Sequence, residues 1–123
     1  MPDSSRIVAV VDDDGSVRDA IKALLRSAGF RVETFDSAEE FLEAGQPKPA
    51  CLVLDVRMAG MSGVELQDHL LASGSTIPIV FMTAHADAGV RGRVLANGAV
   101  RFLQKPFSDD ALLEAIDASL ERA

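Results

Sequence analysis

Short apolar runs that alternate with helical patterns are the feature that most limits what this chain can fold into. Three of the runs, at residues 7–11, 51–54 and 77–82, contain no charged side chain. Unbroken apolar runs of this length are typical of strands that are buried on both faces of a sheet. Two more runs, at residues 30–35 and 100–103, include polar side chains, which suits the edges of a sheet. The sequence therefore predicts five strands, three of them central.

Helical patterns fill the intervals between these strands and follow the last one. Apolar residues spaced three and four apart predict a first helix over residues 17–28, and Gly29 predicts its end. Ser37 and Glu40 have the spacing of a capping box, which predicts the start of a second helix. Further helices are expected over residues 64–73, within residues 87–97 and from the cap residue Ser108 onward. The fourth helix carries two internal glycines, so we expect it to be the loosest of the five.

This order of elements predicts the fold class. Strands that alternate with helices form a parallel sheet, because each helix crosses over right-handedly to reach the next strand. We therefore expect an α/β fold, a three-layer doubly wound (βα)5 sandwich around a five-stranded parallel sheet. A chain of 123 residues has room for one domain. We expect that domain to span residues 1–123, with residues 1–5 as a flexible N-terminal tail.

Charge and composition exclude several classes of protein. Lys and Arg number 12 against 19 Asp and Glu, and the net charge of −7 repels a phosphate backbone, so this domain by itself is not expected to bind nucleic acid. The single Cys51 can form no disulfide within the chain, which fits a reducing compartment. No apolar run approaches the ~18 residues of a membrane span, and the first residues do not resemble a signal peptide. We therefore expect a cytoplasmic protein that does not bind membranes.

Polar residues follow four of the five expected strands: Asp12 and Asp13, Asp55, Thr83, and Lys105. All strands of a parallel sheet point the same way, so these side chains should gather along one rim, where open α/β sheets bind their ligands. Two carboxylates ~4 Å apart repel by about 4 kcal/mol at an effective dielectric near 20, so the acids need a counter-charge. Oxygen ligands without His or Cys favour a hard ion such as Mg²⁺. An ionised Asp beside Mg²⁺ and a Lys can accept a phosphoryl group.

Four motifs also resemble a known family: Val11-Asp12-Asp13, Leu54-Asp55-Val56-Arg57-Met58, Met82-Thr83-Ala84 and Lys105-Pro106-Phe107. They are similar to the signatures of two-component response-regulator receiver domains of the CheY-like superfamily, in the same order and over nearly the whole chain. The resemblance implies a flavodoxin-like sheet of strand order 2-1-3-4-5. Residues 55–63 resemble receivers of the FixJ type, which usually precede a helix-turn-helix output domain. That output domain is not found within these 123 residues.

The resemblance implies roles for single residues of the metal site. Asp55 is the expected phosphoacceptor. Asp13 and Asp55 would bind Mg²⁺ directly, with Mn²⁺ as a possible substitute. Asp12 would act mainly through water, and Arg57 would contribute its backbone carbonyl.

The same resemblance assigns the remaining roles. Lys105 would pair with the phosphate, and the Lys105–Pro106 bond would be cis, a form nearly confined to proline. Thr83 would be the switch hydroxyl, and Phe102 the aromatic residue that moves with it. The phosphoryl group would come from a cognate sensor histidine kinase. Phosphorylation would then alter the face formed by the fourth helix, the fifth strand and the fifth helix.

On this interpretation the protein is a signalling switch that controls an output, with transcription as the expected one. It is not an enzyme, because it assists only its own phosphotransfer and autodephosphorylation. A phosphorylation-dependent homodimer through the altered face is expected from the family resemblance.

Two other functions remain open. Asp12-Asp13-Asp14 resembles the Asp-x-Asp signature of haloacid-dehalogenase-like phosphatases, in which Asp12 would be the nucleophile. That interpretation leaves Asp55 unexplained. The second alternative is a phosphorylation-independent binding module on the same fold, and the intact acceptor, Thr83 and Lys105 argue against it.

Several residues also have structural interpretations. Ser16 with Asp19 could cap the first helix, and Asp14 could be a cap that lies outside the metal site. His69 is expected on the surface. Ala59 stands where the family usually has Pro, so the loop after Asp55 should gain freedom.

Two cationic side chains flank the expected site. Arg57 and His85 lie two residues beyond Asp55 and Thr83. We hypothesise that they restrict the attacking water and prolong the aspartyl phosphate.

Overall fold

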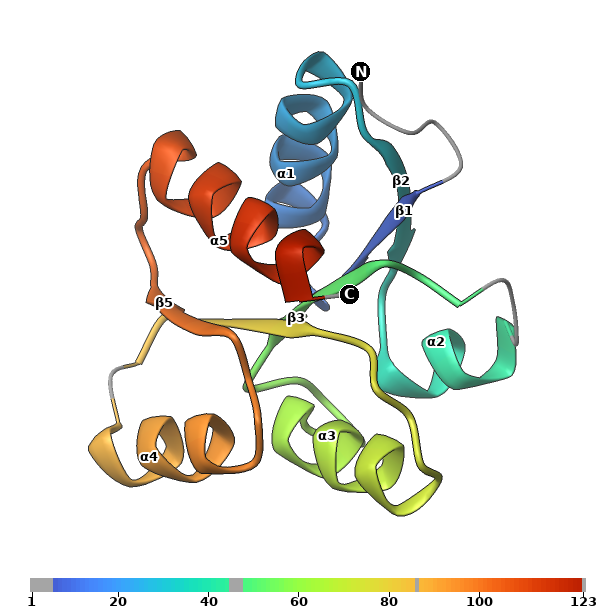
Figure 1. Cartoon of the computed structure of the whole chain (residues 1–123), viewed down its shortest axis with the longest axis vertical. Coiled ribbons are helices and arrows are strands. Elements are labelled where there is room, and N and C mark those ends of the chain that lie inside the picture. Colours follow the sequence, from blue (N-terminus) through green and yellow to red (C-terminus); the bar gives the residue numbers. More distant parts are fainter. Residues whose placement is uncertain (1–5, 45–47, 86, 123) are drawn as a thin grey trace.

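The structure, a computed structural model, describes residues 6–44, 48–85 and 87–122. Within these ranges five strands alternate with five helices in the order β1 (Ile7–Val11), α1 (Gly15–Ser27), β2 (Arg31–Phe35), α2 (Ala38–Ala44), β3 (Cys51–Asp55), α3 (Gly63–Ala72), β4 (Ile79–Thr83), α4 (Ala88–Ala96), β5 (Arg101–Gln104) and α5 (Asp109–Arg122). Figure 1 shows this arrangement. The tail expected at residues 1–5 lies outside the described residues.

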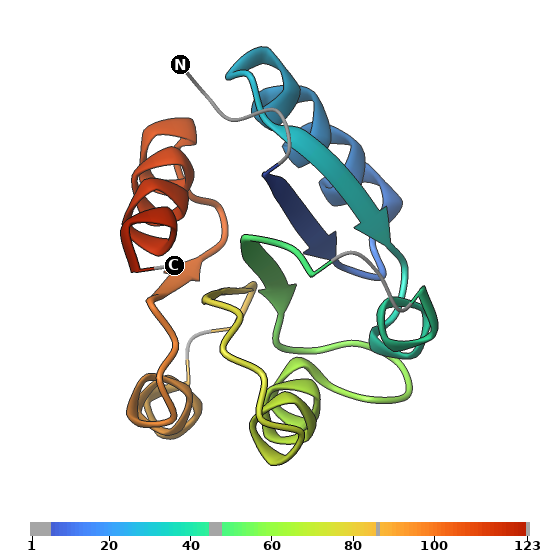
Figure 2. The same cartoon turned by 45° about the vertical axis from the view of Figure 1, so that its right-hand side comes forward.

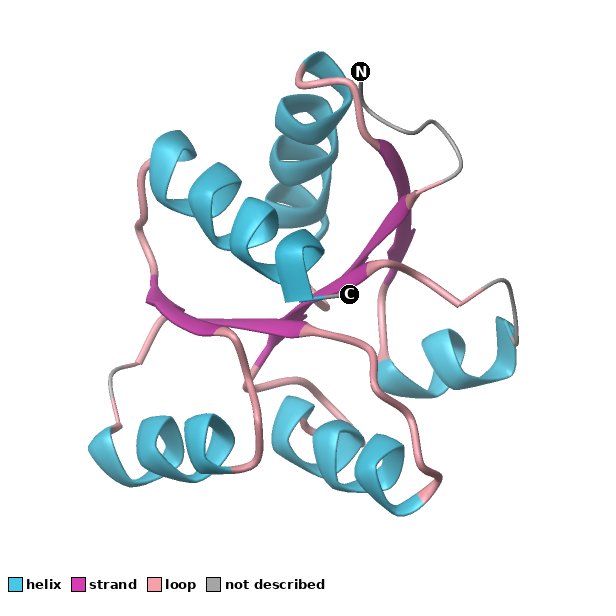
Figure 3. Cartoon of the chain, viewed as in Figure 1, coloured by secondary structure: helices cyan, strands magenta, loops and turns pink. Residues whose placement is uncertain are grey.

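All strand pairs are parallel, and the sheet has the order β2-β1-β3-β4-β5. Helices α1 and α5 cover one face, whereas α2, α3 and α4 cover the other (Figures 1 and 3). Figure 2, turned by 45°, shows the same separation of the helices into two layers. The predicted three-layer α/β fold and its strand order are confirmed. No helix of the described residues is long and apolar enough to cross a membrane.

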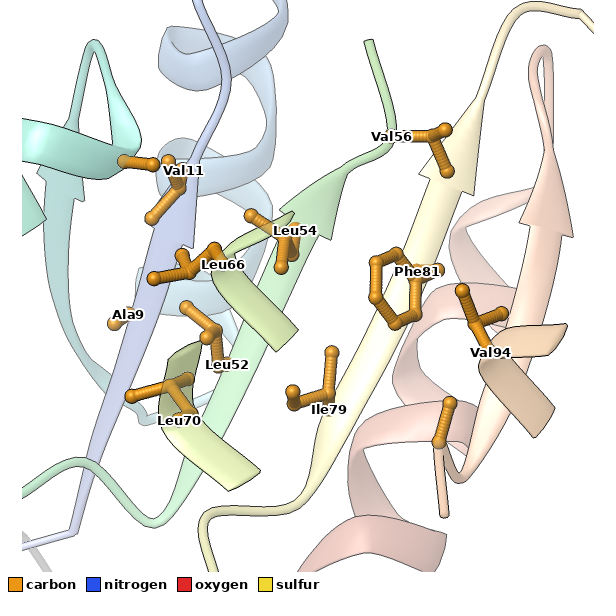
Figure 4. Packing of buried hydrophobic residues seen from close by; sticks show 12 residues of the cluster. Ala9, Val11, Leu52, Leu54, Val56, Leu66, Leu70, Ile79, Phe81 and Val94 are labelled. Carbon is orange, nitrogen blue, oxygen red and sulfur yellow. The ribbon is translucent and has the colours of Figure 1, made fainter. Parts of the chain in front are cut away.

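Two apolar layers hold the helices to the sheet, because successive side chains of a strand point to opposite faces. In β1, Val8 and Val10 belong to the layer beneath α1 and α5, while Ala9 and Val11 belong to the opposite layer. Figure 4 shows that opposite layer, with Leu66 of α3 over the central strands. The three central strands are buried along their whole length, and β2 and β5 are partly exposed, as predicted.

Every strand except β1 differs by one or two residues from the sequence prediction: β3 extends to Asp55, β4 to Thr83, and β5 spans Arg101–Gln104 and not residues 100–103. The fourth strand begins at Ile79 and not at residue 77, because the backbone N–H of Ile77 donates to Ser75 Oγ at 3.3 Å and belongs to the preceding turn. The second strand begins at Arg31 and not at residue 30, because the N–H of Phe30 closes the end of α1. Gly29, with a φ of 95°, reverses the chain there, as its position predicted.

Helix caps fix where the helices begin. Asp14 caps α1 through hydrogen bonds from the N–H groups of Ser16 and Val17, so the cap proposed for Ser16 with Asp19 is wrong. Asp14 lies two positions before Ser16, directly before the first helical residue, so its carboxylate can reach both free N–H groups. The expected capping box of α2 is found in part: Ser37 Oγ accepts from the N–H of Glu40 at 3.0 Å, but the Glu40 carboxylate accepts from Asp36 and not from Ser37.

The later helices follow the same pattern. Ser62 and Glu65 form a full capping box, so α3 begins at Gly63, one residue before the predicted start. Asp87 caps α4, and Ser108 caps α5 as predicted. Val94 is the one buried residue of α4. Val90 and Leu95 of α4 are partly buried against the same layer, and α2 also has one buried residue, Ala38, so burial does not single out α4 as the loosest helix.

Candidate functional site

The carboxyl ends of four strands bring the predicted site residues together. Asp12 follows β1 and Asp55 ends β3, and these two strands are paired with Val11 opposite Leu54. Thr83 ends β4 next to β3, and Lys105 follows β5. The strand order alone thus places acids, a hydroxyl and an ammonium along one rim, where open α/β sheets build their sites.

Three carboxylates form a cluster at this rim. Asp12, Asp13 and Asp55 each offer an oxygen, and these oxygens lie within 4.8 Å of one another. Asp12 is wholly buried, Asp55 is 6% exposed, and Asp13 is open to solvent. Carboxylates this close need cations nearby.

Lys105 supplies one of those cations. Its Nζ lies 2.8 Å from Asp12 Oδ2 and 3.7 Å from Asp55 Oδ2. One ammonium against three carboxylates leaves the site with an excess of negative charge. An incoming cation would be attracted to that excess.

Burial, together with the excess of negative charge, affects the pKa of Asp55. Burial of the carboxyl group, and then the charge of Asp12, raise the pKa of Asp55 from 3.8 to about 6. Lys105 and a hydrogen bond from the backbone N–H of Arg57 act in the opposite direction but do not cancel the rise. Metal-free Asp55 is therefore less ready to ionise than an ordinary Asp.

The donor set fits Mg²⁺. It consists of carboxylate oxygens on the rim, one of them exposed, and hard divalent cations prefer such ligands together with retained water. Arg57, whose backbone carbonyl was predicted to join them, lies in the loop that follows β3. Its side chain is exposed.

The acidic loop after β1 is held by bonds that the sequence did not reveal. Arg18 Nη1 donates to the backbone carbonyl of Asp12 at 2.6 Å, and the N–H of Asp14 donates to Asp12 Oδ1 at 2.9 Å. The N–H of Asp12 also donates to the carbonyl of Phe35 in the neighbouring strand. Arg18 thus helps to position the backbone of Asp12. The helical spacing of the sequence did not distinguish it from the other polar residues of α1.

Thr83 ends β4, and Phe102, the other residue of the expected switch, lies in the neighbouring strand β5. Thr83 Oγ1 donates to the carbonyl of His85 and accepts from its N–H, both at 3.1 Å, so its hydroxyl is engaged in its own loop. Phe102 is half-buried and packs against the layer that contains Phe81. The Lys105–Pro106 peptide is cis, as predicted.

The loop after Asp55 depends on a glycine that sequence analysis did not single out. A Cβ on Gly63 would overlap the backbone carbonyl of Asp55, and the N–H of Gly63 donates to the carbonyl of Val56 at 2.9 Å. The glycine therefore lets the start of α3 pack directly against the end of β3. Its place one residue after the Ser62 cap was the available signal.

Ala59 has a contact that the usual Pro could not make. Its N–H donates to Asp13 Oδ2 at 3.2 Å, and Pro has no such hydrogen. The freedom expected at this position is therefore offset by a backbone bond to a predicted metal ligand.

The arrangement matches a family model described as a response regulator receiver domain over residues 8–117. The chain belongs to this family. It is 43% identical to the transcriptional regulatory protein FixJ of Bradyrhizobium diazoefficiens over 94% of this chain and 57% of that protein. It is 42% identical to the response regulator protein TmoT of Ectopseudomonas mendocina over 100% of this chain and 56% of that protein. The chain thus spans about half the length of the curated relatives it matches.

A solved structure agrees with these relatives. The structure described as FIXJ-N superposes with a TM-score of 0.89 at 37% identity, covering 100% of this chain and 98% of that one. The receiver is therefore similar to receivers of the FixJ type, as its motifs suggested. Family membership favours the receiver over the phosphatase alternative based on Asp12.

Proposed function

We propose that this receiver accepts a phosphoryl group on Asp55 from a cognate sensor histidine kinase and that Mg²⁺ is required. The observation that carries the proposal is the rim itself: Asp55 ends a central strand within reach of Lys105 and beside the carboxylates of Asp12 and Asp13. Asp12 is less suited to be the acceptor, because it is wholly buried and already paired with Lys105 at 2.8 Å.

In the proposed transfer a carboxylate oxygen of Asp55 attacks phosphorus of the kinase phosphohistidine. The P–O bond forms as the P–N bond breaks, and the imidazole nitrogen leaves with the electron pair. Bound Mg²⁺ would supply positive charge to the phosphoryl oxygens and favour ionised Asp55. Asp12, Asp13, Asp55 and the Arg57 carbonyl would hold the ion, and Lys105 would neutralise another phosphoryl oxygen.

The signal is a shift between two conformations. In the present arrangement Thr83 Oγ1 bonds to the backbone of His85. A phosphoryl oxygen on Asp55 would offer that hydroxyl a new acceptor in one conformation only, which favours that conformation. Phe102 would move with Thr83, and the face formed by α4, β5 and α5 would change its affinity for a second copy of the receiver.

The output is proposed to lie outside the receiver. Relatives about twice as long as the matched region include proteins named as transcriptional regulators, so we propose that residues 1–123 form a single receiver domain whose full protein controls transcription. The receiver would act as a switch without turnover on a separate substrate. Buried, reduced Cys51 fits action in the cytoplasm.

Incubation with acetyl phosphate and Mg²⁺, followed by intact mass and peptide mapping, tests the proposal. The wild type should gain one phosphoryl group at Asp55, and Asp55→Asn should gain none. EDTA should prevent the gain. Labelling at Asp12 would instead support the phosphatase alternative, and a wild type that gains nothing would support a phosphorylation-independent binding module.

A further inference from the structure

The loop between β3 and α3, residues 56–62, is held by carboxylates from two different elements. Asp13 accepts the N–H of Ala59 at 3.2 Å, and Glu39 Oε2, on α2, accepts the N–H of Met61 at 2.9 Å. The same loop carries Arg57, whose carbonyl is a proposed Mg²⁺ ligand. Glu39 therefore contacts the loop only a few residues from the metal site.

The contact with Glu39 depends on the local shape of the loop. Gly60, between the two bonded N–H groups, has a φ of 76°, a conformation that favours glycine. A Cβ at this position would lie 2.7 Å from Glu39 Oε2, so the carboxylate sits against the bare backbone of Gly60. The glycine thus permits both the turn of the loop and the close approach of Glu39.

The side chain of Glu39 projects from a fixed point. It lies in the first turn of α2, whose start is fastened by Ser37 and Glu40. Glu39 is exposed, and the N–H of Met61 lowers the pKa of its carboxyl group. Glu39 is thus an anion at neutral pH. Because its side chain is exposed, its hydrogen bond with the Met61 N–H does not serve to pack the core.

We propose that Glu39 is a positioning residue for the phosphoacceptor site, which fixes the loop of residues 56–62 through Met61 and thereby strengthens Mg²⁺ binding. The inference rests on the proposed function of that site. A ligand carried by a loop that is already ordered binds a metal more tightly, because the loop loses no conformational entropy when the metal binds. Glu39 contributes that order from α2, an element that provides no ligand itself.

Three variants separate this role from a general effect of charge. Glu39→Ala removes the acceptor of the Met61 N–H, and Glu39→Gln keeps a carbonyl oxygen that can accept it. Glu43→Ala removes a negative charge from an exposed position one turn further along α2 and serves as the matched control. Mg²⁺ affinity is measured by calorimetric titration of the metal-free chains, and phosphorylation by acetyl phosphate is followed at limiting and saturating Mg²⁺.

Glu39→Ala should bind Mg²⁺ roughly threefold to tenfold more weakly, as expected for the loss of about one net hydrogen bond. Its phosphorylation rate should fall at limiting Mg²⁺ and recover at saturating Mg²⁺. Glu39→Gln and Glu43→Ala should stay within about twofold of the wild type. Amide hydrogen exchange at Met61 should quicken in Glu39→Ala and remain slow in Glu39→Gln, a readout that needs no metal.

Two outcomes would overturn the inference while leaving the proposed function intact. One is wild-type Mg²⁺ affinity in Glu39→Ala. The other is an equal loss in Glu39→Gln, which would assign the effect to charge and not to the Met61 bond. A wild type that binds no Mg²⁺ and gains no phosphoryl group would overturn the proposed function, and with it the role of Glu39.

Discussion

Replacing Asp55 by Asn should stabilise the metal-free protein at neutral and alkaline pH. The pKa of Asp55 is raised from 3.8 to about 6 by burial and then by Asp12. A raised pKa means that the folded protein holds this proton more tightly than the unfolded chain does, so stability falls as the pH rises from 3.8 to about 6. Without screening by solvent, this difference in pKa corresponds to a loss of about 3 kcal/mol in the free energy of unfolding above pH 6. Solvent near partly exposed Lys105 screens part of this electrostatic loss. We therefore expect Asp55→Asn to raise the free energy of unfolding by about 2 kcal/mol.

Urea denaturation in EDTA, followed by far-UV circular dichroism because the chain has no Trp or Tyr, measures this effect. The Asn variant should be more stable than the wild type by about 2 kcal/mol near pH 8, and the gap should shrink toward zero near pH 4. Mg²⁺ added near pH 8 should narrow the gap by stabilising the wild type. A gap that is the same at both pH values, or a wild type that is the more stable at pH 8, would refute the assigned electrostatics.

Three other predictions concern neighbouring positions. Gly63→Ala should lower the free energy of unfolding by about 3 kcal/mol, because the added Cβ would overlap the backbone of Asp55. Gly92→Ala, at a helical position where an added Cβ would meet nothing within 4 Å, should raise the free energy of unfolding by about 0.5–1 kcal/mol. Urea denaturation of both variants checks the pair. Lys105→Ala leaves a wholly buried carboxylate without its partner at 2.8 Å, and should cost about 2 kcal/mol at neutral pH, partly restored by Mg²⁺; unchanged stability would contradict the assigned ion pair. Arg57→Ala and His85→Ala should each shorten the lifetime of the aspartyl phosphate, measured as loss of phosphoprotein after the donor is removed, and unchanged lifetimes would end the hypothesis that these cations restrict water.

The sheet could be predicted because burial on both faces leaves a simple mark on the sequence. Runs such as residues 7–11 and 51–54 contain no charged residue that would need solvent, so their position in the centre of a parallel sheet could be predicted directly. Element ends were harder to place. The start of β4 depended on a turn bond between Ile77 and Ser75, and that of α1 on which of several adjacent polar residues reaches the free N–H groups.

The acids, Thr83 and Lys105 could be predicted to lie together for the same topological reason, since each lies at or just after the end of a strand, whereas Phe102 lies inside β5 and was singled out only by the family resemblance. The residues that support them could not. Arg18, Glu39 and Gly63 act on backbone groups of other elements, and sequence spacing carries no information about such contacts. Their identification needed the distances between elements, which only the folded chain provides.

The bond between Lys105 and Asp12 joins positions 93 residues apart. A growing or truncated polypeptide that lacks β5 has its nucleophile but neither the ammonium nor the last strand end, and on the proposed function it would be a poor target for any phosphodonor. On that function, competence to accept a phosphoryl group would arise only once β5 and Lys105 have been synthesised, because these residues complete the site. The order of the strands along the chain would thus prevent an incomplete receiver from being phosphorylated before it has folded.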